Sequence, residues 1–227
     1  MAMRRIALLI LSLFAFALPA AADEVVVIEE TVEIVEISGD GGSERFVGVE
    51  PAEIPQGIAS FGPFRVLDGS RAALVGVTDA RSPAQFAAML AAYPGITMLE
   101  MIEAPGTEDD RANLKLGRMI RAKGITTYVP AGGSVRSGGV ELFLAGKRRI
   151  ADPGAEFAVH SWADEDGREA NDYPADAPEN RAYVDYYVEM GFPPPQARAF
   201  YAMTNSVPHA DAKWLTAQDM GQWVRLD

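Results

Sequence analysis

Short apolar runs alternate with patterns of helical period between residues 72 and 160, and this alternation limits the fold more than any other feature of the sequence. The apolar runs predict buried strands at residues 72–77, 96–102, 125–129 and 156–160. Helices are expected between the first three runs, at residues 82–93 and 112–123. Strands that alternate with helices of about 10–15 residues form right-handed crossovers and a largely parallel sheet. The sequence therefore predicts an α/β fold.

Cap and stop residues mark the ends of these helices. Residues 82–85, with the sequence Ser-Pro-Ala-Gln, have the pattern of a capping box with proline at the first helical position. Lys123 and Gly124 are the stop signals of the second helix. A short apolar helix is expected over residues 137–145, after a loop at residues 131–134.

The chain after residue 160 is expected to be mainly helical. Residues 164–179 are acidic and contain proline, and they lack the spacing of an EF-hand calcium loop, so they are predicted to form a solvated surface loop. Helical stretches follow at residues 181–190 and 196–203, and Thr216 begins a further helix cap. The predicted fold is thus an α/β domain with a helical C-terminal portion.

The first 22 residues have the pattern of a secretory signal peptide. Arg4 and Arg5 precede an apolar run at residues 6–18, and the small residues up to Ala22 provide a cleavage site. Because the run is too short to span a bilayer comfortably, we expect cleavage after about Ala22 and no stable membrane insertion afterwards. The mature chain is expected to be periplasmic or secreted.

Two further segments follow the signal peptide. Residues 23–71 are interpreted as an acidic lead-in, with an edge strand or a flexible segment at residues 23–37. Residues 72–227 are expected to form the main domain.

The composition excludes several classes of function. The chain of 227 residues has 20 Lys+Arg and 32 Asp+Glu, a net charge of −12, which argues against nucleic acid or an anionic membrane as a partner. The absence of cysteine excludes disulfides, zinc–thiolate sites, iron–sulfur clusters and a cysteine nucleophile. The two histidines, His160 and His209, lack metal-binding spacing. No metal and no other cofactor is therefore expected.

Acyl-transfer chemistry without cysteine needs a serine or threonine that a base activates. Ser137 lies at the first turn of the predicted apolar helix, where free N–H groups can stabilise an oxyanion, although the same position suits an ordinary N-cap serine. His160 ends a predicted strand, where sites gather in open α/β sheets, or it is a packed histidine on a backbone carbonyl. His209 either reaches the same cleft or lies exposed in a loop.

Residues 104–162 resemble the core of the Clp-protease proteolytic subunit and its crotonase-superfold relatives, and they are closer still to the exported Clp-like proteins of bacteria. The motifs that carry the resemblance are Glu-Ala-Pro-Gly-Thr at residues 103–107, Leu-Gly-Arg-Met-Ile-Arg at 116–121, Ser-Gly-Gly at 137–139, Arg-Ile-Ala-Asp-Pro-Gly at 149–154 and Val-His-Ser at 159–161. The likeness is good over residues 72–160 and weak over residues 181–227. It implies a stack of β-β-α units.

The resemblance also implies a Ser-His-Asp triad. Ser137 matches the family nucleophile and His160 matches the general base. The third member normally precedes a hydrophobic–Ser/Thr–Ala–acidic run, which residues 212–219 resemble. A one-residue offset makes Asp211 the best match for the carboxylate that orients the imidazole.

The oxyanion hole of the family matches the backbone amides of Gly106 or Thr107 together with that of Gly138. Two residues depart from the family pattern here. Thr107 replaces the second glycine of the family's turn, which we expect to narrow the seat of a substrate strand. Gly138 and Gly139 replace bulkier pairs, which we expect to loosen the hole.

The function expected from the residues and the resemblance is an exported, peptidase-like serine hydrolase that acts on a peptide or protein. The alternative is a catalytically inactive binding or assembly protein on the same fold, because a fold does not fix a function. A crotonase-like acyl-CoA enzyme is disfavoured, since an exported protein meets no supply of coenzyme A. The rings that Clp-fold proteins form imply a homo-oligomer.

Overall fold

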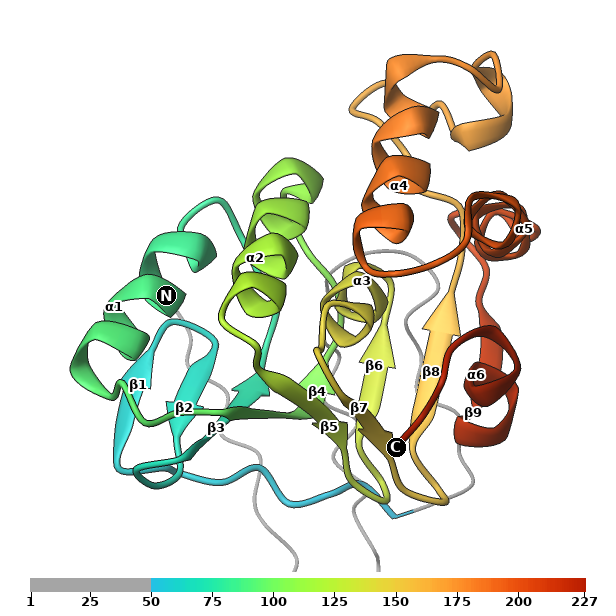
Figure 1. The fold of residues 1–227 in the computed structure, drawn as a ribbon. Coiled ribbons are helices and arrows are strands. Elements are labelled where there is room, and N and C mark those ends of the chain that lie inside the picture. Colours follow the sequence, from blue (N-terminus) through green and yellow to red (C-terminus); the bar gives the residue numbers. More distant parts are fainter. Residues whose placement is uncertain (1–49) are drawn as a thin grey trace, which may run out of the picture. The chain divides into compact units, whose positions relative to one another are not determined.

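A computed structural model describes residues 50–227 of the chain (Figure 1). The predicted signal peptide at residues 1–22 and the predicted edge strand at residues 23–37 lie outside the described residues. Within residues 50–227, no helix has both the length and the apolar character needed to cross a membrane.

One mixed sheet forms the centre of the described chain, with the strand order β1-β2-β3-β4-β6-β8-β9 and a branch in which β5 pairs with β4 and β7 pairs with β5. The strands are β1 (Ala59–Phe61), β2 (Phe64–Val66), β3 (Arg71–Val75), β4 (Met98–Ala104), β5 (Thr126–Val129), β6 (Ser134–Arg136), β7 (Arg149–Ala151), β8 (Glu156–Val159) and β9 (Lys213–Thr216). The helices are α1 (Ser82–Ala92), α2 (Asp110–Ala122), α3 (Gly138–Leu144), α4 (Pro178–Glu189), α5 (Pro194–Thr204) and α6 (Ala217–Trp223), with a 3₁₀ turn η1 (Ala170–Asp172).

The middle of the sheet is parallel and its edges are antiparallel. β3, β4, β6 and β8 run parallel to one another, whereas β1, β2 and β9 are added antiparallel at the two edges. β4 forks, because Met98–Glu100 pair with β5 while Glu103 and Ala104 pair with β6. The predicted α/β fold with a mostly parallel sheet is confirmed. The β-β-α order occurs as β2-β3-α1, as β5-β6-α3 and, with η1 between the second strand and the helix, as β7-β8-α4.

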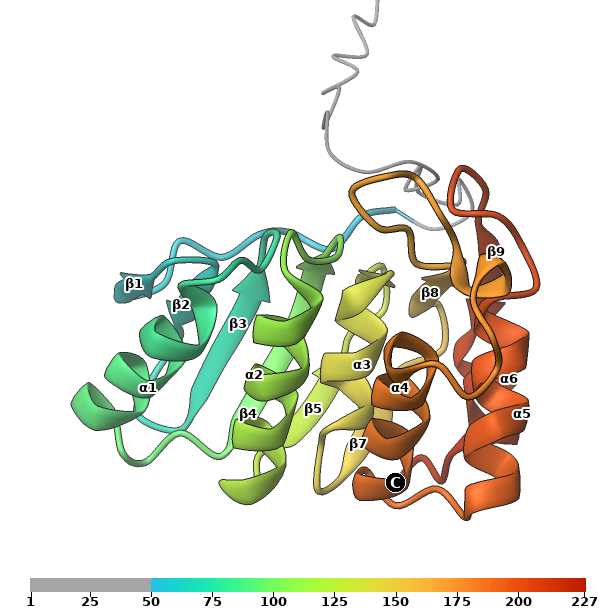
Figure 2. The same cartoon turned by 90° about the horizontal axis from the view of Figure 1, so that it is seen from above.

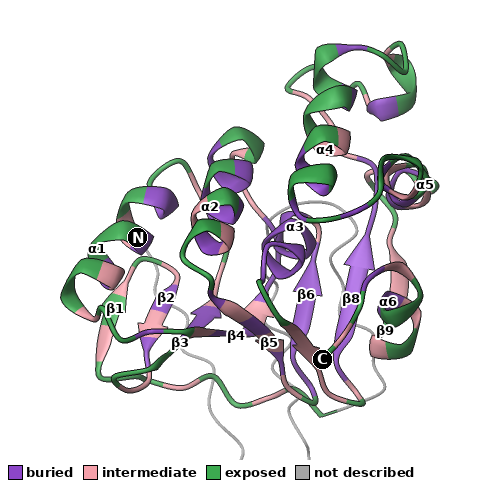
Figure 3. Cartoon of the chain, in the orientation of Figure 1, coloured by how far each residue is buried: buried purple, intermediate pink, exposed green. Residues whose placement is uncertain are grey.

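The helices α1, α2 and α3 lie side by side along one face of this sheet (Figure 2). α3 is buried along its whole length (Figure 3), as expected for the apolar helix predicted there. α4 packs over it: the Tyr186 hydroxyl donates a 2.6 Å hydrogen bond to the Glu141 carbonyl, and it touches α2 at Gly117, where a Cβ would lie 1.9 Å from the hydroxyl oxygen. The first turn of α3 is thereby held between the sheet and the C-terminal helices.

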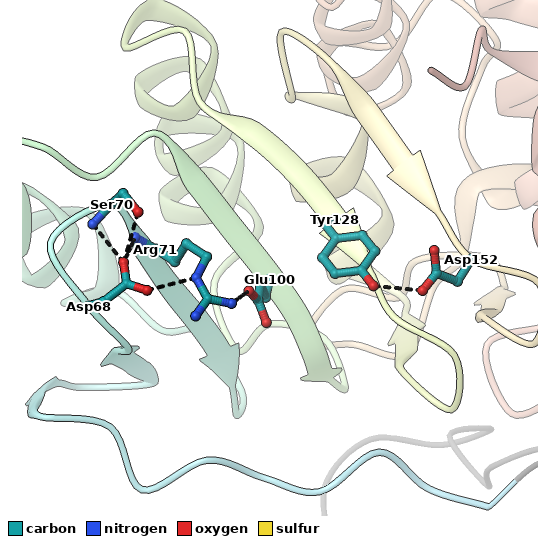
Figure 4. Close-up of polar contacts among 6 residues, drawn as sticks. All are labelled: Asp68, Ser70, Arg71, Glu100, Tyr128 and Asp152. Carbon is teal, nitrogen blue, oxygen red and sulfur yellow. Dashed lines mark hydrogen bonds and ion pairs between the residues drawn. The ribbon is translucent and has the colours of Figure 1, made fainter.

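Polar side chains on β3, β4 and β5 form hydrogen bonds on the side of the sheet away from the buried core (Figure 4). Leu99 and Met101 of β4 are fully buried, so Glu100 between them points to the opposite face, where Arg71 of β3 donates a 2.9 Å hydrogen bond to it. In the next strand, Tyr128 donates a 2.6 Å hydrogen bond to Asp152, which raises the pKa of the Tyr128 hydroxyl to about 12. Pairs that are this accessible to water contribute little to stability and mainly keep this face polar.

Several local predictions were wrong. The strands β6 and β7 have three residues each, and β6 lies partly in the segment 131–134 that was expected to be a loop. Arg81, not Ser82, is the N-cap of α1, and no side chain caps that helix. By contrast, the cap predicted at Thr216 is confirmed, because Thr216 and Asp219 form a reciprocal capping box at the start of α6.

Candidate active site

Ser137 occupies the turn between β6 and α3. Its backbone has φ 48° and ψ −129°, and among residues 50–227 it is the single non-glycine residue with positive φ. The Ser137 N–H donates a 2.9 Å hydrogen bond to the Ala158 carbonyl of β8, which holds the turn against the sheet. A serine in a strained strand-to-helix turn is the backbone arrangement of a nucleophile elbow, and such strain is found where function requires it.

His160 directly follows β8 and is 9% exposed. Its Nδ1 atom lies 2.8 Å from the carbonyl oxygen of Ser161. A carbonyl oxygen can only accept, so this contact places the proton of the neutral ring on Nδ1 and leaves the lone pair on Nε2. Nε2 is then the nitrogen that can take a proton from a serine hydroxyl.

Ser137 and His160 line the same pocket, which has a volume of about 40 Å³. Its other lining residues are Asp110, Gly138, Glu141, Val159, Trp162, Tyr183, Tyr187, Tyr201, Thr204 and Asn205. We call this the Ser137 pocket. Within the described residues no direct hydrogen bond joins the Ser137 hydroxyl to the imidazole. Catalytic contacts of this kind tighten in many enzymes only when substrate binds.

The predicted oxyanion residues lie around Ser137. Gly106 has φ 141°, a conformation that favours glycine, and a Cβ built on it would lie 3.2 Å from the Ser137 Cβ. Gly138 is the first residue of α3, where backbone N–H groups have no acceptor within the helix. The amide of Gly138 therefore lies at a position where it can donate to an oxyanion next to Ser137.

A buried hydrogen-bond network joins this turn to α3. Asn113 of α2 donates a 2.7 Å hydrogen bond from Nδ2 to the Gly138 carbonyl, and its Oδ1 lies 3.0 Å from the Thr78 hydroxyl. The Thr78 N–H donates to the Gly106 carbonyl at 3.1 Å. Thr78 and Asn113 are 1% and 2% exposed, so the network fixes both halves of the candidate oxyanion hole from inside the protein.

Thr107 and Gly138 fit each other in space. A Cβ built on Gly138 would lie 2.7 Å from the Thr107 Cγ2 atom, so the Thr107 methyl group fills the room that a larger residue at position 138 would take. The Thr107 hydroxyl lies 3.2 Å from the Thr78 carbonyl oxygen. Thr107 is thus packed between Gly138 and Thr78.

Asp211 does not take part in this arrangement. It is exposed in the loop before β9, its N–H donates to the Pro208 carbonyl, and it does not line the Ser137 pocket. The Nδ1 position at which a triad carboxylate would bind is next to the Ser161 carbonyl. A backbone group is therefore the imidazole's observed orienter.

The second histidine lies beside the first. The rings of His160 and His209 are 4.7 Å apart between centroids and meet edge to face at 80°. The Nδ1 atom of His209 lies 2.9 Å from the Ser161 carbonyl oxygen, which thus contacts both imidazoles. His209 is thus half-buried against His160 rather than exposed in its loop, but it is not among the residues that line the Ser137 pocket.

Glu141 is the site residue for which the sequence analysis assigned no role. It follows Ser137 by four residues, so both lie on one face of the α3 segment, and it is 7% exposed. Burial raises the pKa of its carboxyl group to about 7, against the opposing effect of a 2.6 Å hydrogen bond from the Tyr187 hydroxyl. A glutamate within an otherwise apolar helix was the signal in the sequence.

In the part of the chain that the structure describes, no group of three or more His, Cys, Asp and Glu side chains is arranged to hold a metal ion.

No protein-family model and no curated protein sequence matches this chain. Among solved structures, it is similar to a mutant of the 1510-N membrane-bound stomatin-specific protease in complex with a substrate peptide, with 15% identity, a TM-score of 0.46 and coverage of 66% of this chain and 72% of that one. It is also similar to a ClpP1 mutant from Listeria monocytogenes (18% identity, TM-score 0.48, 69% and 88% coverage). A third is an enoyl-CoA hydratase from Shewanella pealeana (13% identity, TM-score 0.44, 72% and 66% coverage).

Replacing Gly138 by alanine tests the fit between the two segments. Because the new Cβ would overlap the Thr107 methyl group, Gly138→Ala is expected to lower the free energy of unfolding by about 1–3 kcal/mol. Adding Thr107→Ser, which removes that methyl group and keeps the hydroxyl, should restore part of the loss. Urea denaturation of the two variants and of Thr107→Ser alone measures this coupling, and additive effects of the two changes would contradict it.

The buried Glu141 carboxyl predicts a pH dependence of stability. Its pKa is raised by burial from 4.5 to about 7, so its contribution is fully present below pH 4.5 and is lost as the pH rises through 7. The free energy of unfolding of Glu141→Gln, taken relative to that of wild type, should therefore be higher at pH 8 than at pH 5, by on the order of 2 kcal/mol. Urea denaturation at both pH values checks this, and an unchanged difference between the two proteins would count against the raised pKa.

Proposed function

We propose that the protein is a serine hydrolase, peptidase-like, that acts on a peptide or protein substrate. The observation that carries the proposal is the strained Ser137 turn, which lines one pocket together with His160, whose Nδ1 lies on the Ser161 carbonyl oxygen and whose Nε2 is therefore the basic nitrogen. The adjacent amides of Gly106 or Thr107 and of Gly138 supply oxyanion donors. We further propose that the chain is exported after removal of residues 1–22, acts in the periplasm or outside the cell, and forms a homo-oligomer.

The first half of the reaction forms an acyl-enzyme. The Ser137 Oγ attacks the substrate carbonyl carbon while His160 Nε2 takes the hydroxyl proton. The carbonyl oxygen becomes an oxyanion, to which the backbone amides donate. The tetrahedral intermediate then expels the amine or alcohol, which takes the proton from the imidazolium, and an ester to Ser137 remains.

The second half reverses these roles with water. His160 Nε2 removes a proton from a water molecule, whose oxygen attacks the ester carbonyl carbon. The intermediate expels the Ser137 oxygen, which regains the proton from the imidazolium, and the carboxylic acid leaves. Throughout, the Ser161 carbonyl stabilises the Nδ1 proton, and it stabilises the imidazolium without carrying a full negative charge.

Labelling with a small fluorophosphonate tests this proposal, since the probe phosphonylates only an activated serine. We expect labelling of wild type at Ser137 between pH 7 and pH 9 and no labelling of Ser137→Ala. The matched control is Ser206→Ala, which removes an exposed serine just after α5 and should label like wild type. Peptide mass spectrometry of the adduct identifies the residue.

The alternative function is that of a binding or assembly protein that does not turn over substrate. It is favoured by one observation: His160 Nδ1 meets a neutral carbonyl, where a triad has a carboxylate. On this alternative, folded wild-type protein resists the fluorophosphonate at every pH from 6 to 9, and Ser137→Ala keeps the cellular phenotype.

A further inference from the structure

The Ser137 pocket is lined by aromatic and acidic side chains that the proposed acyl transfer does not use. The turn before α3 supplies Ser137, α3 supplies Glu141, α4 supplies Tyr183 and Tyr187, and α5 supplies further wall residues. At about 40 Å³ the pocket has room for about three water molecules or for the end of one side chain. A substrate group that enters it would lie directly beside the bond that Ser137 attacks, and the chemistry of the lining therefore selects the substrate.

The walls are aromatic. Trp162 and Tyr183 stack with an interplanar angle of 7° and a centroid distance of 6.5 Å, and Tyr183 stacks on Tyr201 at 5.9 Å. The Trp162 indole N–H donates a 2.7 Å hydrogen bond to the Tyr201 hydroxyl, which fixes the arrangement. Aromatic ring faces attract organic cations through their quadrupole.

The charged lining residues are acids. Asp110 and Glu141 both line the pocket, and among its described lining residues there is neither lysine nor arginine. The Tyr187 hydroxyl donates to one oxygen of Glu141, and burial keeps the pKa of that hydroxyl well above its usual range, so it acts as a donor. A carboxylate has two oxygens with about four acceptor sites in all, so Glu141 retains capacity for a donor from a ligand.

Asn205 supplies a further acceptor. It is 8% exposed, and its Nδ2 donates to the Tyr201 carbonyl at 2.8 Å and to the Thr204 hydroxyl oxygen at 3.1 Å, which fixes the orientation of the amide. Its Oδ1 is buried and has no hydrogen-bond partner within the described residues. A buried acceptor without a donor is costly, and a ligand with N–H groups would satisfy it.

We propose that the Ser137 pocket binds the cationic end of a lysine or arginine side chain of the substrate. The ammonium or guanidinium group lies between Glu141 and Asp110 and donates to the side-chain Oδ1 of Asn205, while the methylene stem packs on the aromatic walls. The inference rests on the proposed function for the attack on the adjacent carbonyl, although binding of the cation itself does not depend on that attack. The substrate class is thus a peptide or protein with a basic residue next to the cleaved bond.

Two phosphonate inhibitors that differ in one charge test the proposal on the purified chain. They are dipeptidyl diphenyl phosphonates with either lysine or norleucine at the residue that bears phosphorus, and intact mass gives the rate at which each modifies Ser137. We expect the lysine compound to react about tenfold faster or more. In Glu141→Gln the lysine-to-norleucine ratio should fall towards one. Glu179→Gln, which removes an exposed carboxylate at the start of α4, should keep the wild-type ratio.

The outcomes separate this inference from the proposed function. If the small fluorophosphonate labels Ser137 but norleucine reacts as fast as lysine, the basic pocket is wrong and the hydrolase stands. If no phosphonate labels the folded protein, the proposed hydrolase function is wrong, and the proposed cation pocket is then tested by ligand binding alone. In that case n-butylammonium, but not n-butanol, should shift the aromatic NMR resonances saturably in wild type and not in Glu141→Gln. Equal shifts with both compounds, or with neither, overturn the inference.

Discussion

The rest of the site depends on the close approach of two backbone segments, residues 104–107 and 137–139. A Cβ on Gly139 would lie 2.6 Å from the Ala104 carbonyl oxygen, and one on Gly106 would lie 3.2 Å from the Ser137 Cβ. Protein interiors are packed too densely to absorb such overlaps without a shift of the backbone. Because these positions are glycines, the β6–α3 turn can pack against the end of β4, and the Asn113 hydrogen bond to the Gly138 carbonyl holds it there.

This contact brings a hydroxyl group, backbone amides and an imidazole to one place. The turn presents the Ser137 hydroxyl, the first turn of α3 presents amides, and the end of β8 presents His160. The Ser161 carbonyl binds Nδ1 of both histidines, so a single backbone oxygen organises the only imidazoles of the chain. α3, which begins directly after Ser137, also carries Glu141 into the pocket.

Much of this arrangement was predictable from the sequence. The apolar runs predicted β3, β4, β5 and β8 because each is a buried run bounded by turn residues, and an ordered chain of motifs brought Ser137 and His160 together. β6 and β7 were missed because a three-residue strand is too short to show a period. The Ser161 carbonyl could not be predicted, since every residue has one and only the folded backbone aims it. Asp211 was chosen by a motif offset, and sequence spacing could not place His209, which lies far from His160 along the chain.

The central claim is that Ser137 becomes acylated with His160 as the base. Rapid mixing with p-nitrophenyl acetate, followed by acid quench and peptide mass spectrometry, tests it most directly. The account predicts a burst of nitrophenolate of about one equivalent per chain, with the acetyl group on Ser137 and no burst in His160→Ala. An acetyl group on lysine, tyrosine or another serine, with Ser137 unmodified, would contradict it.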